Sequence, residues 1–130
     1  MTRNTIMAIW LFVLLASMPA RAHHAFASVF DGEKPITLTG PVTKIEWANP
    51  HIQLYIDVKD DTGKVINWAI EMGSPNLLIR LGWTRHAMKV GDVVTIEGHL
   101  ARDGSKLANA RTVLLAGKKM FAVPGEGSGR

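Results

Sequence analysis

Three observations predict a mainly β fold, a small five-stranded OB-like barrel with one short helix between strands three and four. Several short segments alternate apolar and polar residues, which is the period of a half-buried strand. Turn residues separate these segments at residues 60–63 (DDTG) and 102–105 (RDGS). A Ser-Pro pair at residues 74–75 begins a short helical segment. An open β-sandwich of similar size is the alternative, but the position of the helix favours the barrel.

The first 22 residues have the layout of a secretory signal peptide. The basic residue Arg3 precedes an uncharged run at residues 6–18, and the small residues Ala20 and Ala22 then stand at positions −3 and −1 of a cut before His23. The run is shorter than the ~20 apolar residues that cross a bilayer. We therefore expect a periplasmic or secreted protein, with an uncleaved N-terminal anchor as the alternative.

The basic character of the chain mostly disappears with that segment. The 130 residues include 15 Lys and Arg against 11 Asp and Glu. Cleavage before His23 removes Arg3 and Arg21 and no acidic residue, which leaves 13 basic residues, 108 positions and a net charge of +2. This charge is too small for the basic surface that nucleic-acid binding requires. The chain has no cysteine, which excludes disulfide scaffolds, thiol catalysis and cysteine-ligated metal centres.

The mature chain is expected to begin with an extended N-terminal arm over residues 23–35. Residues 36–47 (ITLTGPVTKIEW) are rich in β-branched side chains and predict the first strand. The Gly40-Pro41 pair interrupts this segment and indicates a strand that is bent or bulged at that point. Strongly curved first strands of this kind are typical of small barrels.

The next two strands are the most clearly patterned part of the chain. Residues 51–59 (HIQLYIDVK) alternate, and residues 64–72 (KVINWAIEM) return with a second apolar face after the turn. If the two faces share one core, positions 54, 56 and 58 lie inside opposite 70, 68 and 66, and positions 53, 55 and 57 lie outside opposite 71, 69 and 67. Gln53 and Glu71 then lie opposite each other on the outer face.

The remaining elements complete a barrel domain over residues 36–123. Ser74 as N-cap and Pro75 at the first helical position begin a helix that continues through residues 76–81. Residues 93–100 and 107–116 alternate as the fourth and fifth strands, and a short last strand is expected at residues 120–123. Residues 124–130 are expected to form a flexible tail.

Four segments give the chain a resemblance to a known family. They are His23-His24-Ala25-Phe26 after the signal, WANPH at residues 47–51, Gly82-Trp83, and KVGDVV at residues 89–94. In these segments the chain resembles a family of small secreted bacterial proteins that is catalogued as a domain of unknown function. The resemblance covers essentially the whole mature chain. It implies export and an OB-like barrel, and it brings no established activity.

The histidines predict a metal site that exists only after cleavage. His23 then offers its α-amine and its ring Nδ1, which close a six-membered chelate on one metal ion, and further imidazoles complete a nitrogen set that suits Cu(II). His24 and His51 are the preferred partners, because Pro50 stiffens the approach to His51 and its side chain belongs to the non-core face; His99 is less favoured. We therefore predict copper or another divalent metal. The alternative is that these are ordinary solvated histidines without a ligand role.

The alternative function is binding of a protein or small-molecule partner by the outer barrel face. That face would present Gln53, Tyr55, Asn67 and Glu71, with Trp47 contributing where it is not a core residue. The sequence contains no nucleophile elbow, Gly-rich phosphate loop or HExxH helix, so no enzymatic activity is expected. Nucleic acid is not an expected partner either, because few aromatic side chains face outward. The sequence thus predicts an exported binding protein without a stable membrane span after cleavage.

Overall fold

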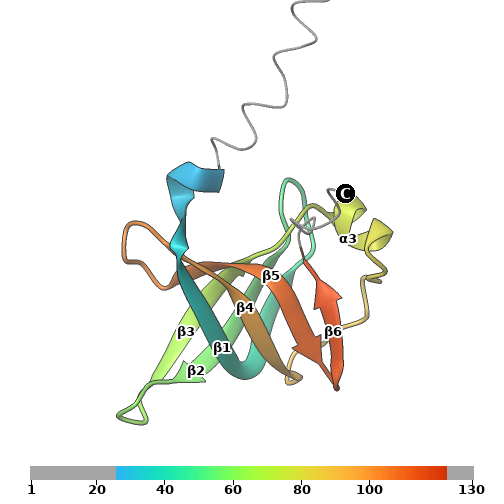
Figure 1. The fold of residues 1–130 in the computed structure, drawn as a ribbon. Coiled ribbons are helices and arrows are strands. Elements are labelled where there is room, and N and C mark those ends of the chain that lie inside the picture. The colour runs from blue at the N-terminus through green and yellow to red at the C-terminus, as the bar shows by residue number, and fades with distance from the viewer. Residues whose placement is uncertain (1–25, 123–130) are drawn as a thin grey trace, which may run out of the picture.

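The computed structural model describes residues 26–122, which form a closed ring of five strands with a sixth strand beside it (Figure 1). The order in the sheet is β3-β2-β1-β4-β5-β6, and a parallel pairing of β3 with β5 closes the ring. The predicted mainly β, OB-like barrel with one short helix between strands three and four is confirmed. The elements are β1 (Phe30–Glu46), β2 (Gln53–Lys59), β3 (Val65–Glu71), α3 (Pro75–Arg80), β4 (Val93–Ala101), β5 (Leu107–Leu115) and β6 (Lys118–Phe121).

β1 joins the two halves of the ring because it changes partner along its length. Its first part, up to Pro41, pairs with β4, and its last part, from Val42 onward, pairs with β2. This change falls where the sequence predicts a bend, and a further irregularity of register follows Val42. A Cβ on Gly40 would lie 1.9 Å from the carbonyl oxygen of Asp57. A glycine is therefore needed for β2 to approach β1 this closely.

The first strand begins at Phe30, which is earlier than the expected residue 36, and a helical turn over residues 26–29 precedes it. The part of the expected extended arm that the structure describes is thus a helical turn followed by a strand. Lys34-Pro35 interrupts the alternation of apolar and polar residues in the sequence. The strand nevertheless pairs with β4 at Phe30 and again from Pro35 onward, with a shift of register between these two residues. Arg102 fixes the turn, because its Nε donates to the carbonyl of Ala27 at 2.7 Å.

The register of β2 against β3 is the predicted one. All six predicted pairs occur, with Ile56 opposite Trp68 on the inside and Gln53 opposite Glu71 on the outside. The inward residues of β1 to β5 meet in one core within the ring, which the helix and the segment after it complete at one end. The fully buried large side chains are Phe30, Val42, Ile52, Leu54, Ile56, Ile70, Met72, Leu78, Val94, Ile96 and Val113.

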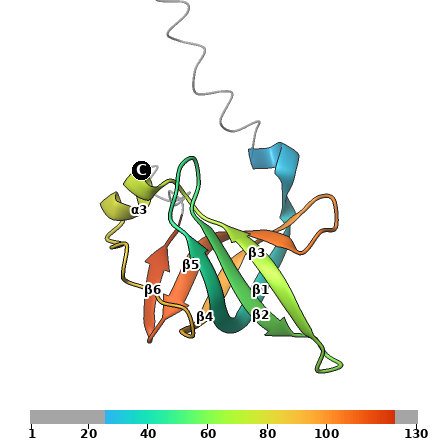
Figure 2. The same ribbon diagram turned by 180° about the vertical axis from the view of Figure 1, so that it is seen from behind.

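The helix α3 begins as the sequence predicts. Ser74 is the N-cap, and its side chain accepts a hydrogen bond from the backbone N–H of Leu77 at 3.3 Å. Trp83 follows the helix, is buried, and donates from Nε1 to the carbonyl of Phe121 in β6 at 2.8 Å. Figure 2 shows α3, the β1–β2 loop and the helical turn at residues 26–29 at the same end of the barrel. Between residues 26 and 122, no helix has the length and apolar character to cross a bilayer.

Candidate functional site

The β1–β2 loop and the end of β3 together form an open depression at that end of the barrel. Backbone pairing of Ile52 sets its geometry, because the N–H of Ile52 donates to Gly73 at 3.0 Å and its carbonyl accepts from Met72 at 2.9 Å. Ile52 is fully buried, so the side chain of the preceding residue, His51, lies on the outer side. The depression is lined by Glu46, Ala48, Asn49, Pro50, His51, Gln53 and Glu71.

The imidazole of His51 is held by a carboxylate from the neighbouring strand. Nδ1 of His51 lies 3.0 Å from Oε1 of Glu71, and the two side chains are 49% and 26% exposed. Glu71 is placed there by its register opposite Gln53. A carboxylate on one ring nitrogen fixes the orientation of an imidazole and leaves the other nitrogen, Nε2, for an external atom. Two of the predicted partner-face residues and the preferred metal ligand thus lie in one depression.

The polar groups of the outer β2 face are largely bonded to one another. The hydroxyl of Tyr55 donates to Oε2 of Glu46 at 3.2 Å, and the ammonium of Lys44 lies 5.3 Å from the centre of the Tyr55 ring. Lys44 also forms an ion pair with Glu46. The hydrogen bond from Lys44 holds the pKa of the Glu46 carboxyl below its ordinary value, and the hydrogen bond from Tyr55 has a smaller effect in the same direction. Tyr55 is half-buried in this cluster.

Asn67 is also satisfied within the protein. Its Nδ2 donates to Oδ1 of Asp57 at 2.8 Å and to Oγ1 of Thr43 at 3.1 Å. Trp47 is partly buried and packs against the hydrophobic core, where it lines a small cavity with Trp83. Trp47 therefore has the core role that the sequence left open.

The structure does not bring all the predicted metal ligands together. His23 and His24 lie outside the described residues. His99 lies on β4 and lines a different pocket, which shares no lining residue with the depression around His51. Within residues 26–122, no group of three or more His, Asp or Glu side chains is placed to hold one metal ion. The described part of the chain thus provides one His–Glu pair for a metal site.

Sequence reasoning missed Arg111, which lines the pocket that contains His99. A signal for it is present in the sequence of β5, where apolar residues stand at positions 108 and 110 and then at 113 and 115. The alternation changes phase between Ala110 and Val113, and such a change indicates a β-bulge. Read in this way, the sequence would have marked Arg111 as a side chain with an unusual direction.

Comparison with known proteins identifies a family and no function. Residues 11–110 match the profile of a family described as a family of unknown function (DUF6152). No curated protein matches the chain.

Proposed function

Because this chain belongs to a family of unknown function, DUF6152, we propose its function from its own residues: it is an exported metal-binding protein. In this proposal the signal segment is cleaved before His23, and the new N-terminal residue chelates Cu(II) through its α-amine and Nδ1. His24 and His51 complete the set of ligands. A set of several nitrogen ligands suits Cu(II), and the absence of cysteine excludes thiolate donors from the site.

The observation that carries this proposal is the contact between His51 and Glu71. Histidines that bind metals commonly donate their second ring N–H to a carboxylate, which fixes the tautomer and raises the basicity of the ligating nitrogen. Nδ1 of His51 has such a carboxylate at 3.0 Å, and its side chain is half-exposed beside an open depression. The His51 imidazole is therefore preorganised to present Nε2 to a ligand.

The position of the N-terminal side of the barrel supports the same arrangement. The helical turn at residues 26–29 and the β1–β2 loop lie at the same end of the ring (Figures 1 and 2). The turn is attached to the barrel by the ring contact of Phe26 with Phe30, whose centroids are 5.3 Å apart, and by the hydrogen bond from Arg102 to Ala27. The chain thus enters the described fold at the end of the barrel where the β1–β2 loop lies.

Metal titration of defined N-termini tests the proposal. Cu(II) is titrated, in competition with a chelator, into a chain that begins at His23, into the same chain with the α-amine of His23 acetylated, and into His51→Gln. The exposed His86 provides the matched control, His86→Gln. We expect acetylation of the His23 α-amine and His51→Gln each to weaken binding by about tenfold or more, since each removes a ligand, and His86→Gln to leave it unchanged. Equal affinities in all four chains would contradict the proposal.

Partner binding by the outer face is the second candidate, and the hydrogen bonds of Tyr55 and Asn67 weigh against it. Both side chains already bond to groups of the same protein, so a partner would have to replace those bonds. Gln53 and Glu71 are the members of this face that border the depression. A pull-down that compares the native chain with Tyr55→Ala tests this candidate, and an unchanged set of captured proteins would count against it.

A further inference from the structure

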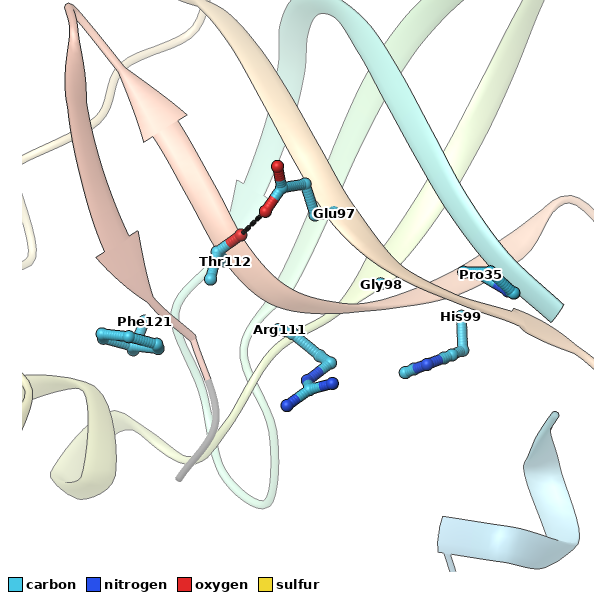
Figure 3. A pocket seen from close by; sticks show the side chains of 7 residues that line it. All are labelled: Pro35, Glu97, Gly98, His99, Arg111, Thr112 and Phe121. Carbon is cyan, nitrogen blue, oxygen red and sulfur yellow. Dashed lines mark hydrogen bonds between the residues drawn. The ribbon is translucent and has the colours of Figure 1, made fainter. Parts of the chain in front are cut away.

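A second pocket lies on the outer side of β4, β5 and β6 and shares no lining residue with the depression around His51. It has a volume of about 220 Å³ and is lined by Pro35, Glu97, Gly98, His99, Arg111, Thr112 and Phe121. Figure 3 shows the side chain of Arg111 between the ring of Phe121 and the imidazole of His99. Arg111 enters this pocket at an irregularity in the pairing of β5 with β4.

Arg111 is the extra residue of a β-bulge. Glu97 pairs with Thr112 and the next residue of β4, Gly98, pairs with Ala110, so Arg111 has no partner in the register. The close approach needs a glycine on β4, because a Cβ on Gly98 would lie 1.8 Å from the carbonyl oxygen of Asn109. A bulge changes the direction of a side chain relative to the regular alternation. Here it directs the guanidinium into the pocket.

The positive charge of Arg111 is not neutralised by the described part of the chain. Its guanidinium makes no ion pair or hydrogen bond with any group of residues 26–122. The nearby acid, Glu97, already accepts from Oγ1 of Thr112 at 2.7 Å and pairs with Lys119 at 2.6 Å. These two contacts, led by the one from Lys119, hold the pKa of the Glu97 carboxyl below its ordinary value. In Figure 3 the Glu97 carboxylate points toward Thr112 and away from Arg111.

The lining of the pocket also includes two apolar residues, Pro35 and Phe121, and the imidazole of His99. Phe121 leaves 54% of its surface exposed, and Pro35 lies beside His99 in the register of β1 against β4. His99 is fixed through its backbone, because its N–H donates to Oδ1 of the buried Asn109 at 2.7 Å. Nδ1 of His99 is buried and has no hydrogen-bond partner among the described residues. One unpaired cation and two apolar surfaces thus line one small pocket.

We propose that this pocket binds a small organic anion, namely a carboxylate carried on a flat apolar body. The planar guanidinium of Arg111 matches a carboxylate with two parallel hydrogen bonds, and Phe121 and Pro35 cover the apolar part. A multiply charged oxyanion fits less well, because the Glu97 carboxylate lines the same pocket. The volume lies below the range of about 300–1,000 Å³ that is usual for drug-sized ligands, so the ligand is small. This inference is independent of the metal proposal, since the two sites share no residue.

Benzoate is a suitable probe of this chemistry, with benzamide as its uncharged analogue and inorganic phosphate as an anion without an apolar body. Binding to the full chain is followed by NMR titration. We expect benzoate to saturate and to shift signals of β4, β5 and β6, while benzamide and phosphate bind at least about tenfold more weakly. Equal binding of benzamide would overturn the role of the charge. Binding of phosphate alone, or of none of the three probes, would overturn the proposed ligand class.

Substitutions of Arg111 and of a control arginine distinguish the effect of the Arg111 guanidinium on benzoate binding from the effect of net charge. Arg111→Gln is expected to weaken benzoate binding by about tenfold or more, and Arg111→Lys, which keeps the charge but not the planar fork, by less. Arg80→Gln removes the same charge from an exposed site on α3 and serves as the matched control, with unchanged binding expected. Because the Arg111 guanidinium bonds to no described group, its replacement should leave the fold intact, which a dispersed amide spectrum verifies. Unchanged affinity in both Arg111 variants would overturn the proposal.

Discussion

Oε1 of Glu71 lies 3.0 Å from Nδ1 of His51, and this contact joins the end of β3 to the loop that precedes β2. Two backbone features hold the pair in place. Gln53 lies opposite Glu71 in the register, and Ile52 bonds to Gly73 through its N–H. Exposed ion pairs contribute little to stability. The contact therefore matters mainly because it fixes the direction of the His51 ring.

Replacement of Glu71 is expected to separate stability from metal binding. Glu71→Gln should change the free energy of unfolding by no more than about 0.5 kcal/mol, yet weaken Cu(II) binding by about tenfold, because the ring loses the carboxylate that orients it. Chemical denaturation and the chelator competition measure the two effects. Asp61→Asn, in the β2–β3 turn at the opposite end of the barrel (Figure 1), is the control for loss of one negative charge. Equal copper affinities of Glu71→Gln and the native chain would remove Glu71 from the site.

Gly40 is expected to be among the least replaceable residues of β1. Gly40→Ala places a Cβ 1.9 Å from the carbonyl oxygen of Asp57, so β1 and β2 must move apart, and we expect a loss of about 1–3 kcal/mol or more in the free energy of unfolding. Gly32→Ala, in the same strand, meets no atom within 4 Å and should be close to neutral. Urea denaturation compares the two. Similar free energies of unfolding of the two variants would show that β1 and β2 can move apart at Gly40 with little loss of stability.

The extent to which the sequence predicts this fold differs between strands for a physical reason. The register of β2 against β3 follows from alternation alone, because one buried face leaves a single alignment that places Ile56 and Trp68 inside. The start of β1 does not follow, because its first residues are paired through distant β4 and their own pattern is broken at Pro35. Tertiary contacts, which a local pattern does not contain, decide such segments.

The candidate sites show the same limit. Alternation places His51, Gln53 and Glu71 on the outer side of their strands, but the 3.0 Å contact between His51 and Glu71 depends on the loop geometry. Tyr55 also faces outward as predicted, yet its hydroxyl donates to Glu46 and is not free for a partner. The alternation of the sequence does not contain this hydrogen bond. Arg111 depends on a bulge whose sequence signal is a single change of phase in β5.

The β2–β3 turn is expected to lose stability in acid through Asp60. Its Oδ1 accepts from the Thr62 hydroxyl at 2.6 Å and from the backbone N–H groups of Thr62 and Lys64 at 2.9 and 3.0 Å. These bonds, led by that of the Thr62 side chain, lower the pKa of Asp60 from its ordinary value of 3.8. Because the folded state holds the proton less tightly than the unfolded state, the contribution is present above pH 3.8 and is lost as the pH falls through the lowered pKa.

Unfolding free energies measured across pH 2–7 check this expectation. The difference between the native chain and Asp60→Asn should be constant near neutral pH and should shrink in acid. Asp61→Asn is the matched control, because the Asp61 side chain accepts no hydrogen bond from a described residue. The same acid-dependent difference in Asp61→Asn would show that the loss reflects overall charge and not the bonds of Asp60.

The indole of Trp83 is expected to attach the segment after α3 to β6. Trp83→Phe removes the donor that bonds the carbonyl of Phe121 at 2.8 Å, and we expect a loss of about 1–3 kcal/mol in the free energy of unfolding. Trp47→Phe is the matched control, because the Trp47 indole N–H donates to no group within residues 26–122, and a smaller loss is expected. Denaturation followed by circular dichroism compares the two variants. A larger loss in Trp47→Phe would contradict the role given to this hydrogen bond.

Native mass spectrometry of the protein purified from its export compartment tests the central proposal most directly, because one spectrum reports both the N-terminus and the bound metal. We predict a chain that begins at His23 and carries one copper ion, which is released when the protein is unfolded in acid. A chain that retains residues 1–22, or a mature chain without metal, would contradict the account.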